Sequence, residues 1–224
     1  MTVDRLKDVE HPEGLTNTQE VLLSQLFEIR AIKFGAFKLK LHDARPEAPL
    51  SPIYIDLRML RRFPEAKAIA VEAYREMTAP LRFDLLADIP TAATPLVSSL
   101  SDRLKVGMIT PRTDSKKHGT GAKIDGLSDT DKGKVVLLID DLITGGDSKL
   151  DAINILIQNG LVVKDVVVLV DRGQGGKEQL EKGGFTLHSA MSMQQMLDFY
   201  TRVGQISIAD RTKIDEGLES LNEN

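Results

Sequence analysis

The chain of 224 residues contains no cysteine and no tryptophan, and aromatic residues make up only 4% of it. The absence of cysteine excludes disulfide bonds, thiolate metal sites and cysteine nucleophiles. The scarcity of aromatic rings argues against a protein that binds single-stranded nucleic acid by stacking bases on aromatic side chains. No apolar run approaches the roughly 20 residues of a membrane-spanning helix.

The chain also lacks an excess of positive charge. It has 29 Lys and Arg residues against 33 Asp and Glu residues, a formal net charge of −4. This balance disfavours nucleic acid and anionic membranes as partners, although it does not exclude a local basic site. The first thirty residues carry no apolar signal core, so we expect a cytoplasmic protein.

The second half of the chain alternates apolar strands with helices. Lys134–Asp140, Val162–Val170 and Phe185–Ser189 have the composition of buried strands, while Ser148–Gln158 and Gly175–Lys182 have that of helices. In the first of these helices we expect Leu150, Ile153, Leu156 and Ile157 to form the buried face. Strands that are apolar throughout and separated by helices predict a parallel sheet with helices on both faces.

The rest of the chain predicts one domain with a subsidiary lobe. Residues 64–208 are expected to form the core, with helices and strands at Pro64–Met77, Arg82–Ala87, Pro95–Leu104 and Val106–Thr110. Residues 14–57 are expected to form a small N-terminal α+β lobe, whose first helix begins at a capping box of Asn17 and Glu20. Residues 209–224 are expected to form a polar, partly helical tail that is too short for a fused decarboxylase domain.

A pair of acids followed by a glycine turn is the strongest candidate for a ligand-binding site in the sequence. The strand that ends at Asp140 and Asp141 runs into Thr144, Gly145, Gly146, Asp147 and Ser148, which open a helix. Glycines and a helix N-terminus together form a phosphate-binding cradle. Two carboxylates beside such a cradle suit ribose hydroxyls or a hydrated magnesium ion. The alternative is that the two acids only end a strand and cap a turn.

A polar stretch between residues 111 and 131 has no hydrophobic periodicity and contains the cations Arg112, Lys116, Lys117 and the neighbouring His118. Cations in a loop can stabilise a leaving group that gains negative charge. A solvated connector with no catalytic role is the alternative.

Taken together, the motifs resemble the type I phosphoribosyltransferases and, among them, the orotate phosphoribosyltransferases. The similar segments run in that family's order over residues 19–207: KFGAFKLK (33–40), SPIYIDLR (51–58), RTDSKKHGTGAKIDG (112–126), VVLLIDDLITGGDSKLDAI (135–153), VDRGQGG (170–176) and GFTLHSAMSMQQML (184–197). The resemblance implies transfer of the 5-phosphoribosyl group of phosphoribosyl pyrophosphate (PRPP) to orotate. The products would be orotidine 5′-monophosphate and pyrophosphate, within UMP biosynthesis.

The resemblance also implies roles for individual residues. Asp140 and Asp141 would hold the ribose hydroxyls, with Asp141 also counted as catalytic, and residues 144–148 would bind the 5′-phosphate. Arg112, Lys116, Lys117 and His118 would bind the pyrophosphate from a mobile loop, residues 111–122, that reaches the neighbouring site of a homodimer. Arg112, Lys116 and His118 would also be catalytic. Lys40, Tyr54, Thr144 and Arg172 would contact orotate. Magnesium is expected to bind PRPP and to contact Asp140 and Asp141 through bridging water. No residue is assigned as a direct ligand.

Some of these roles have structural alternatives. Lys40 could be an exposed lysine on a strand face, Tyr54 could serve packing, and Arg172 could form a salt bridge at the sheet edge. His118 is compatible with protonating the leaving group, because histidine titrates near neutral pH, but a histidine considered by itself is more often a surface residue than a proton donor.

The chain departs from the family pattern at several positions. Thr113 stands where a second cation is usual, Thr91 and Ala92 replace the usual residues of a pyrophosphate-contacting loop, and Asp147 puts an acid in the phosphate cradle. We expect Asp147 to point away from the phosphate and to cap the helix. Residues 41–50 form an insertion without a functional explanation. A phosphoribosyltransferase for another nucleobase and a PRPP-binding regulatory protein without turnover therefore remain alternatives.

Overall fold

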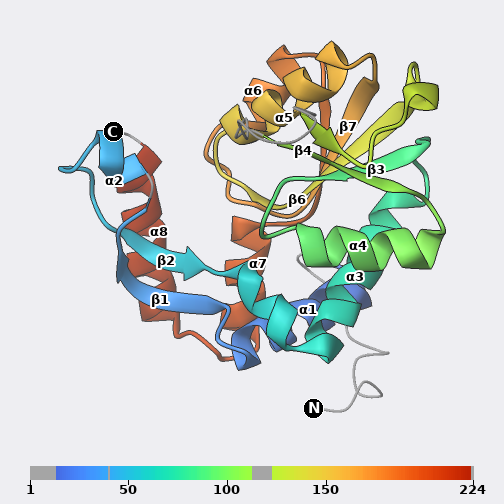
Figure 1. Cartoon of the computed structure of the whole chain (residues 1–224). Helices are drawn as coiled ribbons and strands as arrows, with labels where there is room; N and C mark the ends of the chain where they lie inside the picture. Colours follow the sequence, from blue (N-terminus) through green and yellow to red (C-terminus); the bar gives the residue numbers. More distant parts are fainter. Residues whose placement is uncertain (1–13, 40, 113–122, 223–224) are drawn as a thin grey trace. The chain divides into compact units, whose positions relative to one another are not determined.

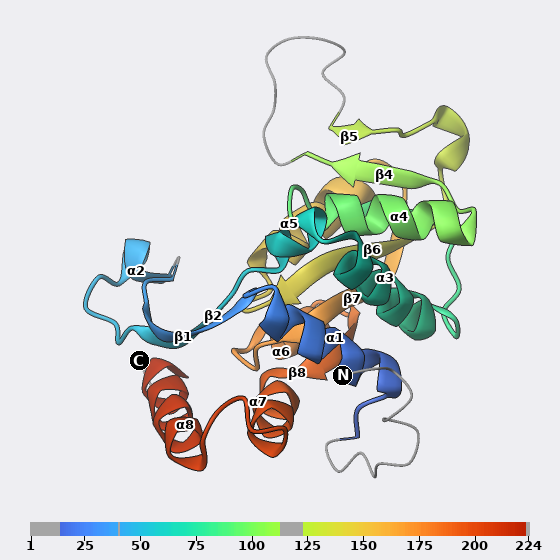
Figure 2. The ribbon, with the colours of Figure 1, turned by 90° about the horizontal axis from the view of Figure 1, so that it is seen from below.

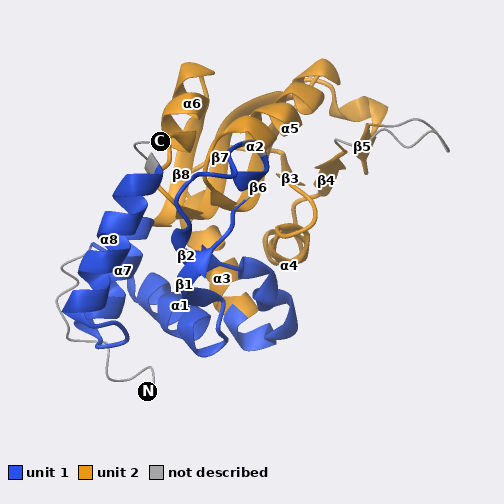
Figure 3. Ribbon diagram, turned by 90° about the vertical axis from the view of Figure 1, so that its left-hand side faces the viewer, with its two compact units in different colours: residues 1–66, 193–224 blue, residues 67–192 orange. Residues whose placement is uncertain are grey.

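The structure is a computed structural model that describes residues 14–39, 41–112 and 123–222. The chain divides into two compact units (Figure 3). Unit 1 comprises Met1–Ala66 and Met193–Asn224, and unit 2 comprises Lys67–Ser192. The C-terminal residues therefore group with the N-terminal residues, whereas the sequence analysis assigned residues up to 208 to the core.

Unit 2 is built on a six-stranded sheet with the strand order β5-β4-β3-β6-β7-β8. Neighbouring strands run parallel except for β5, which pairs antiparallel with β4 at one edge (Figure 2). In chain order the strands are β3 (Leu85–Asp88), β4 (Met108–Pro111), β5 (Ile124–Asp125), β6 (Val135–Ile143), β7 (Val162–Asp171) and β8 (Thr186–Ser192).

Helices cover both faces of this sheet. They are α3 (Pro64–Thr78), most of which belongs to unit 2, α4 (Thr94–Leu104), α5 (Asp147–Gln158) and α6 (Gly176–Lys182), with a short 3-10 helix η3 (Asp129–Asp131). Helices α3 and α4 lie on one face, and α5 and α6 lie on the other (Figure 1). A core cluster joins Val136 and Leu138 of β6 to Ala152, Ile153 and Leu156 of α5. Burial on both faces explains why the central strands are apolar throughout.

Unit 1 combines an antiparallel strand pair with helices from both ends of the chain. Its elements are α1 (Asn17–Glu28), β1 (Ile32–Phe37), α2 (Leu41–Ala44), β2 (Ser51–Ile55), the 3-10 helix η2 (Leu57–Arg62), α7 (Met193–Arg202) and α8 (Ile208–Asn222). Helix α7 packs on α1, and α8 packs on β2. The buried hydroxyl of Tyr200 donates a hydrogen bond to the Leu23 carbonyl at 3.1 Å, and Arg202 pairs with buried Glu20. These contacts tie the C-terminal helices to the N-terminal ones.

The predicted fold class is confirmed: a mostly parallel sheet lies between helices, and a small antiparallel sheet forms near the N-terminus. Some local predictions were wrong. The capping box of α1 uses Thr16 and Gln19 rather than Asn17 and Glu20, because Glu20 is buried against Arg202. The C-terminal tail was predicted to be partly helical, and its described residues belong to one helix, α8, which begins at Ile208 and ends at Asn222. The strand β5 lies within the polar stretch of residues 111–131 and was not predicted, because two residues are too few to produce a periodic pattern.

Candidate functional site

The predicted acid pair lies at the carboxyl end of β6, between β3 and β7. Successive side chains of a strand point to opposite faces. Val136 and Leu138 pack against α5, so Asp140 belongs to the same face and Asp141 to the other. Asp140 is buried and Asp141 is half-buried. The pair therefore lies where ligands bind in parallel α/β sheets, beyond the carboxyl ends of the strands.

Asp140 is held by a buried lysine that the sequence analysis did not identify. The ammonium nitrogen of Lys149 lies 2.5 Å from Asp140 Oδ2 and donates a second hydrogen bond to the Leu142 carbonyl at 2.7 Å. Lys149 is buried with Ala152, Ile153 and Leu156, whereas Ile157, expected in the buried face, is 45% exposed. The sequence does contain a signal for this burial: Lys149 lies three residues before Ala152 and four before Ile153, so helical periodicity places it on the same buried face of α5.

The surroundings of the two acids perturb their protonation. Burial and, after it, the negative charge of Asp140 together raise the pKa of Asp141 to about 7. Burial also raises the pKa of Asp140, while the ammonium of Lys149 opposes the rise. Burial, with the charges of both acids, keeps the pKa of Tyr74 well above its usual value, so its hydroxyl is a neutral donor to the Asp140 carbonyl at 2.8 Å. Strongly perturbed carboxyl groups at a sheet edge are typical of functional sites.

The glycine turn after β6 leads directly into α5. The helix begins at Asp147 and its N-cap residue is Gly146, which has no side chain to form a cap. The prediction that Asp147 caps the helix is therefore wrong. Asp147 accepts a hydrogen bond from Gln179 Nε2 of α6 at 2.6 Å, and Gln179 Oε1 accepts one from the Gly146 amide at 2.7 Å. Gln179, which the sequence analysis also missed, thus binds the acid that departs from the family pattern.

Gly176 is a further residue on which the turn depends. A side-chain carbon placed there would lie 2.6 Å from the carbonyl oxygen of Thr144 and 2.5 Å from Ile143 Cγ1. Backbone and buried core cannot both move away, so α6 approaches the turn closely only because residue 176 is glycine.

Arg172 lies next to the start of this turn. Ile143 and Asp171 are paired in the register of β6 and β7, and the Arg172 amide donates to the Ile143 carbonyl at 3.0 Å. The side chain is buried, and burial lowers its pKa. Because the usual value for arginine is so high, the guanidinium keeps its charge at neutral pH. Unit 2 therefore brings together Asp140, Asp141, Thr144–Ser148 and Arg172 at one edge of its sheet.

The cationic loop lies mostly outside the described residues, and with it the predicted Lys116, Lys117 and His118 as well as Thr113. At the N-terminal end of this loop, Arg112 forms a bidentate ion pair with Asp125 of β5, with both N–O distances at 2.6 Å. The other loop with departures, at Thr91 and Ala92, follows β3. There the buried carboxylate of Asp88 accepts hydrogen bonds from the hydroxyls of Thr94 and Thr110. These bonds connect the end of β3 to the start of α4 and to β4.

Two predicted orotate contacts belong to unit 1. Lys40 lies outside the described residues. Tyr54 of β2 packs on the ring of Phe37, with ring centroids 5.6 Å apart, and its hydroxyl accepts a hydrogen bond from Arg58 at 2.8 Å. The roles predicted for both remain predictions.

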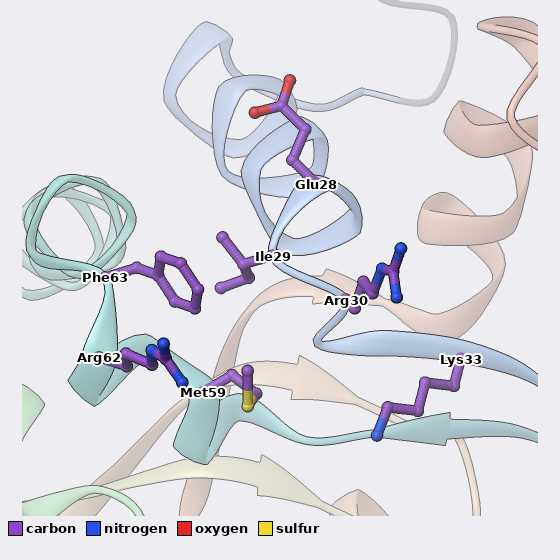
Figure 4. A pocket seen from close by; sticks show the side chains of 7 residues that line it. All are labelled: Glu28, Ile29, Arg30, Lys33, Met59, Arg62 and Phe63. Atoms are coloured by element: carbon purple, nitrogen blue, oxygen red, sulfur yellow. The ribbon is translucent and has the colours of Figure 1, made fainter.

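Unit 1 also contains a pocket of about 610 Å³ that none of the predicted site residues line. Ile29 and Phe63 point toward each other across it, and the cations of the lining come from Arg30, Lys33 and Arg62 (Figure 4).

Neither a metal cluster nor a membrane helix is found in the part of the chain that the structure describes. No three His, Asp or Glu side chains converge there as metal ligands. Among the same residues, no helix combines the length and the apolar character that crossing a membrane requires.

The chain is similar to proteins of known family. No protein-family model matches the chain. It is 35% identical over 178 residues to the orotate phosphoribosyltransferase of Pyrobaculum aerophilum, covering 79% of this chain and 88% of that protein. It is 33% identical over 186 residues to the bifunctional enzyme PyrF/PyrE of a Nostoc species, covering 83% of this chain.

The chain spans only 37% of the length of that bifunctional enzyme. Among solved structures, the orotate phosphoribosyltransferase of Aeropyrum pernix superimposes with a TM-score of 0.71 at 29% identity, covering 83% of this chain and 99% of that one. The identity, the coverage and the common fold lead to one conclusion: the chain belongs to the orotate phosphoribosyltransferase family.

Proposed function

We propose that the chain transfers the 5-phosphoribosyl group of PRPP to orotate, which yields orotidine 5′-monophosphate and pyrophosphate in the route to UMP. The observation that carries this proposal is the placement of Asp140, Asp141 and the glycine turn at the carboxyl end of β6, ahead of the N-terminus of α5. In a member of this family, such a placement supports a site that binds ribose and phosphate side by side.

The acids and the turn bind the sugar phosphate. Asp141 is the less buried of the two acids, and when ionised it accepts hydrogen bonds from ribose hydroxyls. The 5′-phosphate lies at the N-terminus of α5, where backbone amides and the positive end of the helix dipole favour an anion. Since the Gly146 amide already donates to Gln179, we assign the phosphate to the other amides of Thr144–Ser148.

Bond breaking at ribose C1 leaves positive charge on the sugar while the departing pyrophosphate gains negative charge. Arg112, Lys116, Lys117 and His118 supply the cations that stabilise this leaving group. In the structure Arg112 pairs with Asp125, and we infer that it leaves this partner for the phosphate oxygens when PRPP binds. Losing one such donor typically raises the barrier by roughly 2.7–4 kcal/mol.

Orotate carries a carboxylate, and Arg172 is suited to bind it. The buried guanidinium offers paired donors in a fixed plane that matches a carboxylate. Lys40 and Tyr54 are assigned to the same substrate from the family pattern.

Magnesium is assigned to the pyrophosphate of PRPP rather than to a cage of protein ligands. Mg²⁺ prefers a few carboxylates together with substrate phosphates and water. The half-buried carboxylate of Asp141 fits that donor chemistry through a bridging water, and the described residues offer no larger cluster of acids. When bound, the ion neutralises charge on the leaving group.

We also propose a homodimer in which residues 111–122 reach the neighbouring site, and a cytoplasmic location. Light scattering tests the first: a monomer at micromolar concentration would contradict it.

A kinetic assay separates this function from the alternatives. Consumption of orotate in the presence of PRPP and Mg²⁺, with formation of orotidine 5′-monophosphate and release of pyrophosphate from PRPP, supports the proposal. Turnover with uracil or a purine base in place of orotate would indicate another phosphoribosyltransferase. PRPP binding without turnover of any base would indicate a regulatory protein.

A further inference from the structure

Lys149 is an unusual residue for the interior of a sheet–helix layer. Its side chain is 5% exposed and that of Asp140 is 8% exposed. Lysine is rarely buried to this degree unless it is paired, because removing an ammonium from water is costly. The ion pair with Asp140 and the hydrogen bond to the Leu142 carbonyl supply the partners.

We propose that Lys149 is a positioning residue for PRPP: it holds Asp140 and the backbone before the phosphate-binding turn in place, and its charge cancels one of the two negative charges of the acid pair. This inference rests on the proposed function and adds a residue to it.

The first argument is geometric. Lys149 lies in the first turn of α5, which begins at Asp147. From there a single nitrogen atom contacts a side chain at the end of β6 and a carbonyl two residues before Thr144. One group thus links the acid of the ribose site, the start of the phosphate-binding turn and the helix N-terminus. Loss of the Lys149 ammonium would remove the contacts that hold Asp140, the Leu142 carbonyl and the first turn of α5 together.

The second argument is electrostatic. PRPP carries phosphates at both ends of its ribose, and two uncompensated carboxylates beside it would repel them. Charges interact strongly at short distance in a poorly solvated site. The ammonium at 2.5 Å from Asp140 Oδ2 makes that acid part of a neutral pair, so Asp141 remains as the acid that faces the substrate. Asp140 also interacts with the backbone and side chain of Asp141, and the uncharged hydroxyl of Tyr74 donates a hydrogen bond to its carbonyl, so Lys149 is the cation that compensates this acid.

The test compares Lys149→Met with wild type by calorimetric titration with PRPP and Mg²⁺ and by steady-state kinetics. Methionine keeps the length and apolar stem of lysine but removes its charge. We expect the Kd and the KM for PRPP to rise by about tenfold or more, the loss expected for a charge-assisted hydrogen bond, while the KM for orotate is unchanged. Lys177→Met on α6, at a side chain that is 53% exposed, is the matched control and should bind PRPP as wild type does.

A second variant separates charge from packing. Removing Lys149 alone leaves a buried carboxylate without its partner, which can unfold a protein, whereas replacing both members of a buried pair is tolerated much better. The double variant Asp140→Asn/Lys149→Met should therefore fold and bind PRPP more tightly than Lys149→Met alone. The single variant Asp140→Asn is measured beside it to complete the cycle. If the loss of PRPP affinity in the double variant equals the product of the losses in the two single variants, Lys149 does not act through Asp140, and the inference is overturned.

The outcomes distinguish this inference from the proposed function. If wild type consumes orotate and Lys149→Met binds PRPP equally well, the inference fails alone. If wild type does not bind PRPP at all, the proposed function fails and the inference fails with it.

Discussion

Replacing Asp141 by asparagine removes a charge and a titrating proton with little change in size. Asparagine Oδ1 can still accept the hydrogen bond that the Leu142 amide donates to Asp141 Oδ1 at 2.8 Å. In the folded protein burial and the charge of Asp140 raise the pKa of Asp141 to about 7, against 3.8 as the ordinary value. At a pH between these two pKa values, Asp141 holds a proton in the folded state that it has released in the unfolded chain. The stability that this group contributes is therefore fully present below about pH 4 and is lost as the pH rises through 7.

The size of the effect follows from the shift. Each pKa unit corresponds to about 1.4 kcal/mol, so a shift of about three units would cost at most about 4 kcal/mol above pH 7. Between pH 5 and pH 8 the loss would be about 2–3 kcal/mol. Because Asp141 is half-buried, partial solvation reduces this to about 2 kcal/mol. Asparagine does not titrate, so the variant should gain roughly 4–8 °C in Tm relative to wild type between pH 5 and pH 8.

Thermal unfolding followed by circular dichroism at the two pH values measures this difference. The same substitution at Asp151, which is exposed on α5, is the control and should shift Tm equally at both pH values. An Asp141→Asn variant whose Tm relative to wild type is the same at pH 5 and pH 8, or lower at pH 8, would refute the reasoning. The variant should also lose affinity for PRPP, since the acid that accepts the ribose hydroxyls is gone.

Three further substitutions test individual roles. Lys116→Ala should lower kcat by about 10²–10³-fold with little effect on the Kd for orotate; comparable losses in both, by stopped-flow and calorimetry, would contradict its leaving-group role. Arg172→Lys keeps the charge but loses the paired donors, so the KM for orotate should rise about tenfold while the KM for PRPP does not, and the reverse pattern in steady-state kinetics would argue against the assignment. Gln179→Glu places a second acid beside Asp147 and removes the donor that binds it, so PRPP affinity measured by calorimetry should fall; unchanged affinity would show that Asp147 does not depend on Gln179.

The sequence predicted those features that a few adjacent residues determine. The strand that ends at Asp140, the turn through Gly145 and Gly146, and the helix that follows are local, and their order along the chain is enough to place them. The β7 strand and the position of Arg172 after it were predictable for the same reason: long apolar runs bounded by glycine have few other structures available.

The features that were missed depend on residues far apart in the chain. Gln179 binds the Gly146 amide from 33 residues away, and no pattern in the sequence links the two. Lys149 interrupts an apolar stripe, and its buried position follows only once α5 is docked on β6. The capping box was predicted at Asn17 and Glu20 but lies at Thr16 and Gln19. Glu20 instead pairs with Arg202, which is 182 residues distant. Polar side chains whose hydrogen-bond partners lie far away in the chain produce no periodic pattern in the sequence, so these contacts could not be predicted from it.

The central claim is that the site at the carboxyl end of β6 transfers phosphoribose to orotate. Its most direct test is the rate of orotate consumption by the purified chain with PRPP and Mg²⁺, followed by chromatographic detection of orotidine 5′-monophosphate, with Asp141→Asn as the matched variant. We expect one equivalent of the nucleotide and of pyrophosphate for each orotate consumed, and a large loss of rate in the variant. Wild type that forms no orotidine 5′-monophosphate, or a variant as fast as wild type, would contradict the account.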